Sequence, residues 1–445
     1  ETWKASDGVH RIASNVRVLA TVTIEACARV ELDASGSLAI GSSPKPGKLI
    51  AAGTFEGGKL SPVLFGAKDA SKPWGAIVVD STGSLDLSYT VITGGDSPTS
   101  QQNGGGQIRL FGESSTSKGG VPKVTVTGRT TYDGLDIEFL TWQLPMGPKT
   151  EAVLLKPSGA KGRLPGILAL HDHGGMKFLG WRKIVRTSAE PWTIQQKHQA
   201  QYYGGVGWAN EIAKRGYVVL VHDTFPFASR RVRVADVPER LRAGGVDPAP
   251  EDEEGVAKYN RFAREHEDIM EKSLISAGTT WPGVYLVEDQ RALDVLAARS
   301  DVDPTRLGCG GLSGGGMRTV FLGGLDERIK VAIAVGFMTT WREFLLDKAF
   351  THTWMTYVPL LPKDLDFPEI LALRAPAATM VRNCRQDQLY TMPEMERADR
   401  MIAETFRRAN ASDRYKSIYY EGGHKFDREM QSDAFAWFDR FLKQK

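Results

Sequence analysis

From residue 121 onward, short apolar segments typical of β-strands alternate with longer segments of helical periodicity. Two of the apolar segments, Pro165–Leu170 and Tyr217–Val221, are continuous, as in strands that are covered on both faces. Between them, Trp208–Gly216 has the pattern of a helix that ends at a glycine. This alternation predicts a doubly wound, mostly parallel α/β sheet over residues 121–445.

The alternation continues to the C-terminus. A second helix is predicted over Gly283–Arg299, and a last amphipathic helix over Met430–Leu442. Four more strands are predicted at Arg306–Gly310, Ile329–Val335, Ala378–Arg382 and Tyr415–Tyr420.

The first 112 residues differ in composition and periodicity. Of the 26 serines in the chain, 16 precede residue 121, whereas seven of the eight histidines follow it. Segments with period-2 alternation and β-branched residues, such as Val16–Glu25, follow one another without a helical segment. We therefore predict an all-β domain over residues 1–112, a polar linker over 113–120, and the α/β domain over 121–445.

This first part resembles the right-handed parallel β-helix of bacterial secreted and surface proteins, in phrases such as Thr21–Glu25 and Lys48–Thr54. The resemblance implies a β-helix-like stack of short strands and an extracellular or cell-surface location. The strand pattern leaves a β-sandwich open as an alternative. A short β-helix exposes its ends, so a structural or adhesive module is the expected role.

Charge and hydropathy restrict the class of protein. The formal net charge is +3 over 445 residues. Dedicated nucleic-acid-binding proteins normally carry a strongly basic face, so this balance does not favour a nucleic-acid partner. No apolar run reaches the roughly 18–20 residues that a membrane-spanning helix needs. The sequence therefore predicts a globular protein without a membrane span.

One short motif indicates a chemical mechanism. Gly311–Gly315, with the sequence GLSGG, is the only match in the chain to the pattern G-x-S-x-G. It follows the predicted strand Arg306–Gly310 and precedes a helical segment from Met317, which is the strand–turn–helix context that the motif requires. Small residues flank the serine because such a turn has no room for side chains. The motif predicts Ser313 as a nucleophile held at a helix N-terminus.

With other phrases, this motif resembles the dienelactone-hydrolase-like branch of the α/β hydrolases, in particular proteins described as acetyl xylan esterases. The similar phrases cover nearly all of residues 121–445: Tyr132–Leu135, Leu170–Gly175, Trp208–Tyr217, Gly311–Gly316 and Gly422–Phe426. Dienelactone hydrolases use a cysteine nucleophile, whereas this chain has Ser313. The resemblance therefore implies an α/β-hydrolase fold and an esterase that needs no cofactor.

The α/β-hydrolase fold orders its triad as serine, acid and histidine, so the base must follow Ser313. Only His352 and His424 do so. His424 follows the last strand in a glycine-rich loop that can reach over Ser313, and it is the predicted base. His352 is expected to pack or to line the pocket. Asp387, just after the penultimate strand as the family pattern implies, is the predicted acid, with Glu343 as the alternative.

His171–Gly175 follows the strand Pro165–Leu170 and resembles the H-G-G loop that supplies a second oxyanion N–H group in this fold. The N–H of Gly174 or Gly175 is expected to complete an oxyanion hole with that of Gly314. The His-x-His pair could instead bind a metal. No further histidines or cysteines cluster with it, so we predict no metal site.

Residues 225–282 form a highly charged segment with few strand signals. The segment leaves the sheet at the edge where α/β proteins bind ligands, so we interpret it as a lid-like insertion. Phe225 and Trp281 at its ends are candidate pocket residues, together with His173.

These observations predict a serine esterase that acts through an acyl-Ser313 intermediate. The resemblance implies a small-molecule or carbohydrate ester as substrate, such as the acetyl groups of a plant xylan. A peptidase or a thioesterase on the same triad is an alternative. A non-catalytic β-helix adhesion or binding protein, whose α/β part serves only as a scaffold, is another.

Overall fold

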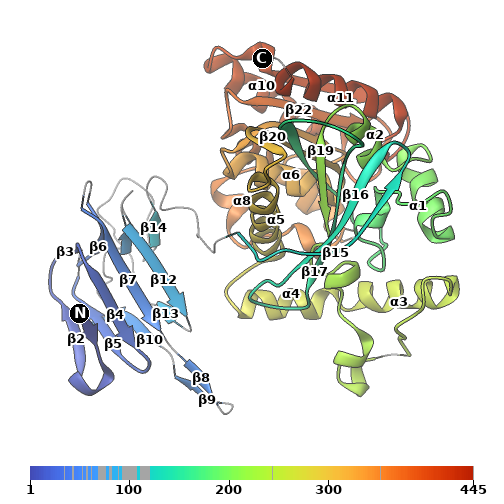
Figure 1. The fold of residues 1–445 in the computed structure, drawn as a ribbon. Coiled ribbons are helices and arrows are strands. Elements are labelled where there is room, and N and C mark those ends of the chain that lie inside the picture. The colour runs from blue at the N-terminus through green and yellow to red at the C-terminus, as the bar shows by residue number, and fades with distance from the viewer. Residues whose placement is uncertain are drawn as a thin grey trace. The chain divides into compact units, whose positions relative to one another are not determined.

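A computed structural model of the chain describes residues 1–34, 36–42, 45–52, 54–56, 59–61, 63–68, 77–79, 83–88, 90–92, 108–110, 121–242, 244–350 and 352–443. The chain divides into two compact units, Glu1–Lys118 and Gly119–Lys445 (Figure 1). The predicted linker, residues 113–120, lies outside the described residues. Within the described ranges, no helix combines the length and the apolar character that crossing a membrane requires.

The N-terminal unit consists mainly of three four-stranded sheets whose strand pairings are parallel. The first contains β1 (Thr2–Trp3), β4 (Thr21–Glu25), β7 (Gly47–Ala52) and β12 (Gly83–Ser88). The second contains β2 (Val9–Ile12), β5 (Arg29–Leu32), β10 (Val63–Ala67) and β13 (Thr90–Ile92). The third contains β3 (Val16–Val18), β6 (Leu38–Ile40), β11 (Ile77–Val79) and β14 (Ile108–Leu110). A turn η1 (Ala5–Asp7) and an antiparallel pair, β8 (Thr54–Glu56) and β9 (Lys59–Ser61), complete the unit.

Successive strands of the three sheets visit them in turn. Alternation decides which side chains face inward: in β4, Val22 and Ile24 are buried, whereas Thr21 and Glu25 are exposed. Buried apolar residues from all three sheets form one core. The segment Val16–Glu25 is divided between two sheets, and the parallel pairing differs from the antiparallel pairing of a β-sandwich.

The C-terminal unit is built on a nine-stranded mixed sheet. Its spatial order is β15 (Thr125–Tyr132), β16 (Leu135–Trp142), β17 (Thr150–Pro157), β19 (Val218–His222), β18 (Leu164–Leu170), β20 (Val302–Leu312), β21 (Ile329–Val335), β22 (Ala378–Cys384) and β23 (Tyr415–Tyr420). The strands from β19 to β23 run parallel, whereas β15, β16 and β17 pair antiparallel at one edge. The predicted α/β class is therefore confirmed.

Helices cover both faces of this sheet (Figure 1). The core on one face includes residues of α5 (Trp281–Ala297), α6 (Gly314–Leu325), α9 (Phe367–Ala372) and α10 (Met392–Arg408). The core on the other face includes residues of α1 (Thr193–Tyr203), α2 (Trp208–Lys214) and α11 (Arg428–Leu442). In β18, Leu168 and Leu170 belong to the first core, and Ile167 and Ala169 to the second. This two-sided burial explains why the strand segments are continuously apolar.

The predicted insertion consists of short helical segments: η4 (Ala228–Arg230), η5 (Val234–Asp236), η6 (Glu239–Leu241), α3 (Glu253–Glu265) and α4 (Glu267–Ser276). Val256, Tyr259 and Phe262 of α3 pack in an apolar cluster with Phe178 and Leu179, which follow β18. The insertion is thus packed onto the unit through a core of its own. The remaining short elements are η3 (Trp181–Lys183), α7 (Trp341–Glu343), η7 (Phe344–Lys348), η8 (Trp354–Thr356), α8 (Leu361–Asp364) and η9 (Ser412–Arg414).

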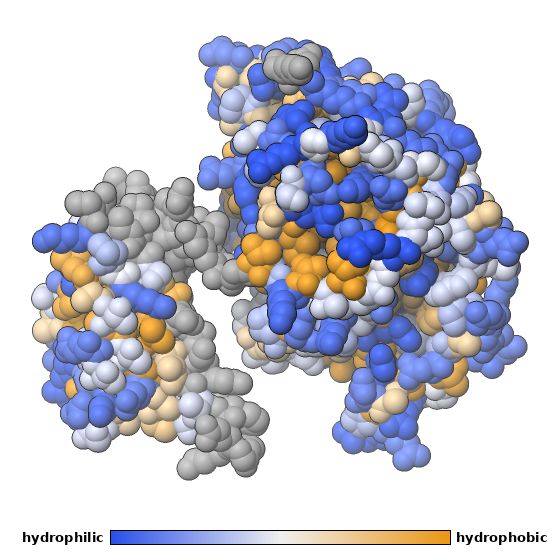
Figure 2. Space-filling model, in the orientation of Figure 1, coloured by the Kyte–Doolittle hydropathy of each residue, from blue (hydrophilic) through white to orange (hydrophobic). Residues whose placement is uncertain are grey.

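The helix ends follow from capping residues. The predicted helix Gly283–Arg299 corresponds to α5, which begins two residues earlier because Thr280 caps it, its hydroxyl accepting from the N–H of Gly283 at 3.2 Å. The predicted last helix corresponds to α11, where Asp427 accepts from the N–H of Met430 at 3.2 Å. On the face shown in Figure 2, the α/β unit is mostly hydrophilic, with one group of apolar residues near its centre.

Candidate active site

Ser313 lies in the turn between β20 and α6, at the carboxyl-terminal end of a central parallel strand. Its backbone has φ 58° and ψ −117°, a conformation that non-glycine residues rarely adopt. The turn is held by a hydrogen bond of 2.8 Å from the N–H of Ser313 to the carbonyl oxygen of Val335 in β21. Such a strained, sharply turned serine is the geometry of a nucleophile elbow.

The glycines around Ser313 are required by backbone contacts. A Cβ atom added to Gly311 or to Gly315 would lie closer than 3.0 Å to the carbonyl oxygen of Leu170, at the end of β18. One added to Gly316 would lie equally close to the carbonyl oxygen of Val335. Since these contacts are with backbone in buried strands, the neighbours cannot move aside without disturbing the sheet.

His424 and Asp387 form a hydrogen-bonded pair beside this turn. The Nδ1 atom of His424 lies 2.6 Å from Oδ2 of Asp387, whose side chain is buried and whose Oδ1 also accepts from the N–H of Leu389 at 3.0 Å. An ionised carboxylate only accepts hydrogen bonds, so this contact requires the proton on Nδ1 and leaves Nε2 unprotonated in the neutral ring. Among the described residues, that Nε2 has no hydrogen-bond partner.

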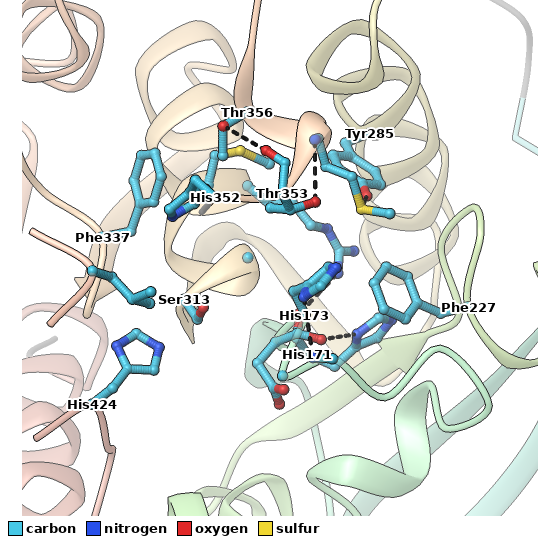
Figure 3. Close-up of a pocket in the computed structure, with 18 of the residues that line it drawn as sticks. His171, His173, Phe227, Tyr285, Ser313, Phe337, His352, Thr353, Thr356 and His424 are labelled. Carbon is cyan, nitrogen blue, oxygen red and sulfur yellow. Dashed lines mark hydrogen bonds between the residues drawn. The ribbon is translucent and has the colours of Figure 1, made fainter. Parts of the chain in front are cut away.

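The imidazole of His424 lies at the elbow. A Cβ atom added to Gly336 would come within 2.9 Å of both His424 Cε1 and Cδ1 of Leu312, the residue before Ser313. Ser313 and His424 line the same cavity, where Figure 3 shows them next to each other on one side, with His171 and His173 on the other.

Glu343, the alternative acid, is engaged elsewhere. Its Oε2 accepts a hydrogen bond from the hydroxyl of Thr391. The structure therefore brings Asp387, and not Glu343, to the imidazole of His424.

The loop after β18 contains the predicted oxyanion donors, Gly174 and Gly175. The N–H of Gly175 donates to Nδ1 of His173 at 3.1 Å and is therefore already engaged. Gly174 and Gly175 both have positive φ, at 50° and 65°, so the loop turns back on itself. A Cβ atom added to Gly314 would lie 3.0 Å from the backbone nitrogen of His173. The backbone nitrogen of His173 thus lies beside Gly314.

Buried charges fix this loop. Lys183 donates from Nζ to the carbonyl oxygens of Asp172 at 2.6 Å and His173 at 2.8 Å. The carboxylate of Asp172 accepts from Nε2 of His198 at 3.1 Å and from the hydroxyl of Tyr203. Burial lowers the pKa of Lys183 to about 8. Burial alone would raise the pKa of Asp172, but His198 and Lys183 hold it well below its ordinary value, so Asp172 stays charged.

Glu267 joins the insertion to both sides of the cavity. This buried residue of α4 accepts hydrogen bonds on Oε1 from Nζ of Lys177, and Nε2 of His173 lies 3.2 Å from the same oxygen. Its Oε2 accepts from the hydroxyl of Thr353 at 2.7 Å and from the N–H of Trp354 at 3.1 Å. Burial would raise the pKa of Glu267, but the contacts with His173 and Lys177 lower it. In the sequence, only its place in a charged segment distinguishes this residue.

The cavity has a volume of about 240 Å³. Its wall is largely aromatic and apolar, with Phe227, Tyr285, Met317, Phe337, Met355, Leu389 and Tyr390. The polar side chains that line it include His171, His173, Ser313, Arg318, His352, Thr353, Thr356 and His424 (Figure 3).

Of the predicted pocket residues, His173 lines the cavity, whereas Phe225 and Trp281 do not. These two rings stack on each other with centroids 6.1 Å apart, and Trp281 is completely buried. The two rings pack together where the insertion begins and ends. Phe227, two residues after Phe225, lines the cavity instead. His352 lines it too, and burial lowers the pKa of its ring to about 4. Over the described parts of the chain, no group of three or more histidine, cysteine, aspartate or glutamate side chains is placed to hold a metal ion.

Comparisons with known proteins agree on the fold. The profile of the prolyl oligopeptidase family matches residues 270–385. The YtaP protein of Bacillus subtilis, which is named as a hydrolase, is 23% identical over 310 residues, which cover 69% of this chain and 88% of YtaP. With the sheet order and the turn at Ser313, the family match identifies the C-terminal unit as an α/β-hydrolase fold.

Several solved structures are similar to the chain. Methylesterase BT1017 is 16% identical with a TM-score of 0.47, over 72% of this chain and 57% of the methylesterase, so the match spans little more than half of that protein. A protein of Bacteroides fragilis described as an acetyl xylan esterase is 16% identical, with a TM-score of 0.48, over 68% of this chain and 70% of its own. A glucuronoyl esterase from Solibacter usitatus is 17% identical, with a TM-score of 0.46, over 72% and 86%.

Proposed function

We propose that the α/β unit is a serine hydrolase of carboxylic esters, with Ser313 as nucleophile, His424 as base and Asp387 as acid. The observation that carries this proposal is the state of His424. Its Nδ1 is held at 2.6 Å by a buried carboxylate, while its Nε2 is free of partners among the described residues and the ring lines the cavity of Ser313. A serine hydroxyl becomes nucleophilic when such a base takes its proton.

The reaction follows from this arrangement. Ser313 Oγ attacks the ester carbonyl while His424 Nε2 takes the hydroxyl proton, and Asp387 stabilises the resulting imidazolium. We assign the oxyanion donors to the N–H of Gly314 and to that of His173, whose backbone nitrogen lies 3.0 Å from the Cβ position of Gly314. His424 then gives its proton to the departing alcohol, which leaves an acyl-Ser313. A water molecule, deprotonated by His424, releases the acid and restores the serine.

The size of the cavity favours a small acyl group as substrate. The cavity of about 240 Å³ around Ser313 is lined largely by aromatic and apolar side chains. Similar solved proteins are described as acetyl xylan, glucuronoyl and methyl esterases. An acetylated plant carbohydrate such as acetyl xylan is therefore the substrate class that we propose. The family match at residues 270–385 makes a peptidase the second candidate.

Hydrolysis of p-nitrophenyl acetate by the full chain tests the chemistry. Ser313→Ala should lower kcat by about 10⁴-fold or more and abolish labelling by a fluorophosphonate, while the oxyanion donors support a slow background rate. His424→Ala should cost about as much, and the double variant little more, because the two groups act as one unit. Near-normal turnover by Ser313→Ala would refute the mechanism. Release of acetate from acetyl xylan, compared with cleavage of proline-containing peptides, separates the two candidate substrates.

For the N-terminal unit we propose a right-handed parallel β-helix that serves as a structural or adhesive module. Support comes from its three parallel sheets, from strands that visit the sheets in turn, and from the single core that they enclose. An experimental structure in which strands of one sheet pair antiparallel would contradict this proposal.

A further inference from the structure

A second hollow opens at the same edge of the α/β sheet as Ser313. The strand β17 begins where its antiparallel neighbour β19 ends, with Ala152 opposite His222, and residues on either side of this point line a groove of about 430 Å³. Four of its charged lining residues are cations, namely Lys149, Arg182, Arg231 and Arg233, and one is a carboxylate, Glu151.

These cations have few partners in the protein. Within the described residues, none of the four lies within ion-pair distance of a carboxylate, and the guanidinium of Arg182 donates no hydrogen bond. Arg231 donates one, to the carbonyl oxygen of Ala228 at 3.0 Å, and its Nε is buried without a partner. In contrast, the adjacent Arg230 pairs with the buried Glu288.

Arg182 is also rigidly held. Its guanidinium carbon lies 4.0 Å from the ring centroid of Trp181 and 4.2 Å from that of Trp192. Stacking fixes the plane of the guanidinium, so little freedom is lost when its N–H groups bind an anion in their plane. Asp223 and Glu151 attract Arg182 without an ion-pair contact, so its guanidinium N–H groups and the buried Nε of Arg231 remain donors that a bound carboxylate would satisfy.

The groove adjoins the catalytic cavity. Phe227 lines the cavity of Ser313, and the next residue, Ala228, lines the groove. Another hollow, of about 330 Å³, shares Lys149, Glu151 and Arg182 with the groove and continues it along β15 and β16. The groove and the catalytic cavity thus have neighbouring residues of one segment in their walls.

We propose that this groove binds a glycan chain that carries uronate carboxylates. Single carboxylates spaced along such a chain match separate guanidinium groups, each of which can bind one in bidentate fashion. Trp192 and the proline side chains of the groove offer apolar surface to the sugar rings. The identification of this glycan as the substrate rests on the proposed ester hydrolysis, whereas its binding does not.

Binding is measured on the full chain with Ser313→Ala, which cannot turn over an ester by the proposed route. The probes are a de-esterified oligogalacturonide and a neutral xylo-oligosaccharide of equal length, titrated by calorimetry. The oligogalacturonide should bind, more weakly as salt is raised, and the neutral chain should bind at least about tenfold more weakly. Arg182→Gln and Arg231→Gln should each weaken oligogalacturonide binding by about tenfold.

Arg233→Gln offers a variant at an exposed position, where folding is not at risk, and should weaken binding in the same direction. The matched control is Arg400→Gln, an exposed arginine of α10, which packs on β23 at the opposite edge of the sheet. It removes the same charge and should leave binding unchanged. Hydrolysis of p-nitrophenyl acetate by Arg233→Gln with Ser313 intact should also stay normal, because that ester is too small to reach the groove.

Equal affinity of the groove variants and of Arg400→Gln would overturn the proposal, as would binding of a single-stranded oligonucleotide but not of the oligogalacturonide. If the protein binds the oligogalacturonide but hydrolyses no ester, the proposed ester hydrolysis is refuted and the proposed glycan binding is supported. If it hydrolyses p-nitrophenyl acetate but does not bind the oligogalacturonide, the proposed glycan binding is refuted and the proposed ester hydrolysis is supported.

Discussion

The elbow at Ser313 and the wall of the cavity around Glu267 are fixed in different ways. At the elbow, main-chain atoms pack directly against main-chain atoms. The neighbouring carbonyl oxygens leave no room for a Cβ atom on Gly311, Gly315 or Gly316. At the wall, one carboxylate of α4 receives hydrogen bonds from segments that lie about ninety residues away on either side, at His173 and Thr353. The elbow therefore depends on close packing, and the wall on a charge that burial would otherwise neutralise.

The difference has a consequence for substitution. A contact between main-chain atoms cannot be replaced by another side chain, whereas a hydrogen-bonded carboxylate can be exchanged for an amide of the same shape. Substitutions at the elbow and in the triad should therefore cause large losses of activity or stability. Substitutions at the wall should cause smaller losses.

The largest effect is expected from the acid of the triad. Asp387→Asn should lower kcat for p-nitrophenyl acetate by about 10³- to 10⁴-fold, because an amide no longer fixes the Nδ1–H tautomer of His424 or stabilises its charged form. The fold should survive, since an asparagine oxygen can still accept from the N–H of Leu389. Thermal melting of the variant checks this point.

Glu343→Gln is the matched control. It removes one carboxylate from the alternative position, where the partner is Thr391 and not the catalytic imidazole. Its kcat should stay within about twofold of the parent, as for most substitutions away from the reacting groups. A large loss here, with a small one at Asp387, would assign the acid to the residue after β21.

The elbow was the part of the site that the sequence predicted best, and packing explains why. Gly311, Ser313 and Gly315 are neighbours in the chain, and the strand and helix that flank them also have local signals. The continuous apolar strands likewise predicted an α/β sheet because both of its faces are covered. The antiparallel edge of β15 to β17 was not predicted, since a strand segment does not show which neighbour it will pair with.

The next effect concerns the fit of the elbow. In Gly315→Ala the added methyl group would lie closer than 3.0 Å to the carbonyl oxygen of Leu170, so the free energy of unfolding should fall by about 3 kcal/mol. Urea denaturation of the full chain measures this loss. Gly283→Ala in α5 is the control, because its nearest atoms are the side-chain oxygens of Thr279 and Thr280, at 3.1 Å and 3.3 Å. That variant should lose at most about 1 kcal/mol, because these side-chain hydroxyls, one of them the Thr280 cap, can shift where a backbone carbonyl cannot. Equal losses would show that the elbow has no special packing.

A smaller and graded effect is expected at the wall. Glu267→Gln keeps the shape of the side chain but leaves Lys177 buried without its carboxylate, so the free energy of unfolding should fall by about 2 kcal/mol. Because Glu267 also positions His173, kcat/KM for p-nitrophenyl acetate should fall by about tenfold.

Glu271→Gln is its control, one helical turn further along α4. Glu271 is buried, and neither of its carboxylate oxygens has a partner among the described residues. Burial raises its pKa to about 7, so its stabilising protonated form is lost as pH rises through 7. An unfolded glutamate loses its proton near pH 4.3, so this loss of stability builds up between about pH 4.3 and 7. The amide should therefore match the parent near pH 4 and be stabilising relative to it at pH 7 and above. If both variants lose equal stability, the partners of Glu267 do not hold the wall.

The wall was largely beyond prediction because its contacts join distant segments. Phe225 and Trp281 are large apolar residues at the ends of the insertion, which made them candidates for the pocket. In the structure their rings stack on each other and pack in the core instead. Phe227 differs from Phe225 by only two positions, and only the path of the chain after β19 decides which of them faces the cavity. Likewise, the backbone nitrogen of His173 lies beside Gly314, and the two glycines that follow it turn the loop back.

The smallest effect is a pH dependence carried by His352 in the wall. Burial lowers the pKa of this ring to about 4 in the folded protein, below the roughly 6.5 of an unfolded chain. Between these values the unfolded state binds a proton that the folded state does not, so stability falls as pH drops from about 6.5 to 4 and changes no further below that. His352→Gln should therefore reduce the drop in Tm over this window. It should not abolish the drop, because burial also lowers the pKa of His171 well below its ordinary value. The same substitution at His10, which stacks on Trp3 in the N-terminal unit, controls for the loss of a histidine as such. An unchanged slope in His352→Gln would mean that its ring is as easily protonated in the folded protein as in water, and that this side of the cavity is open.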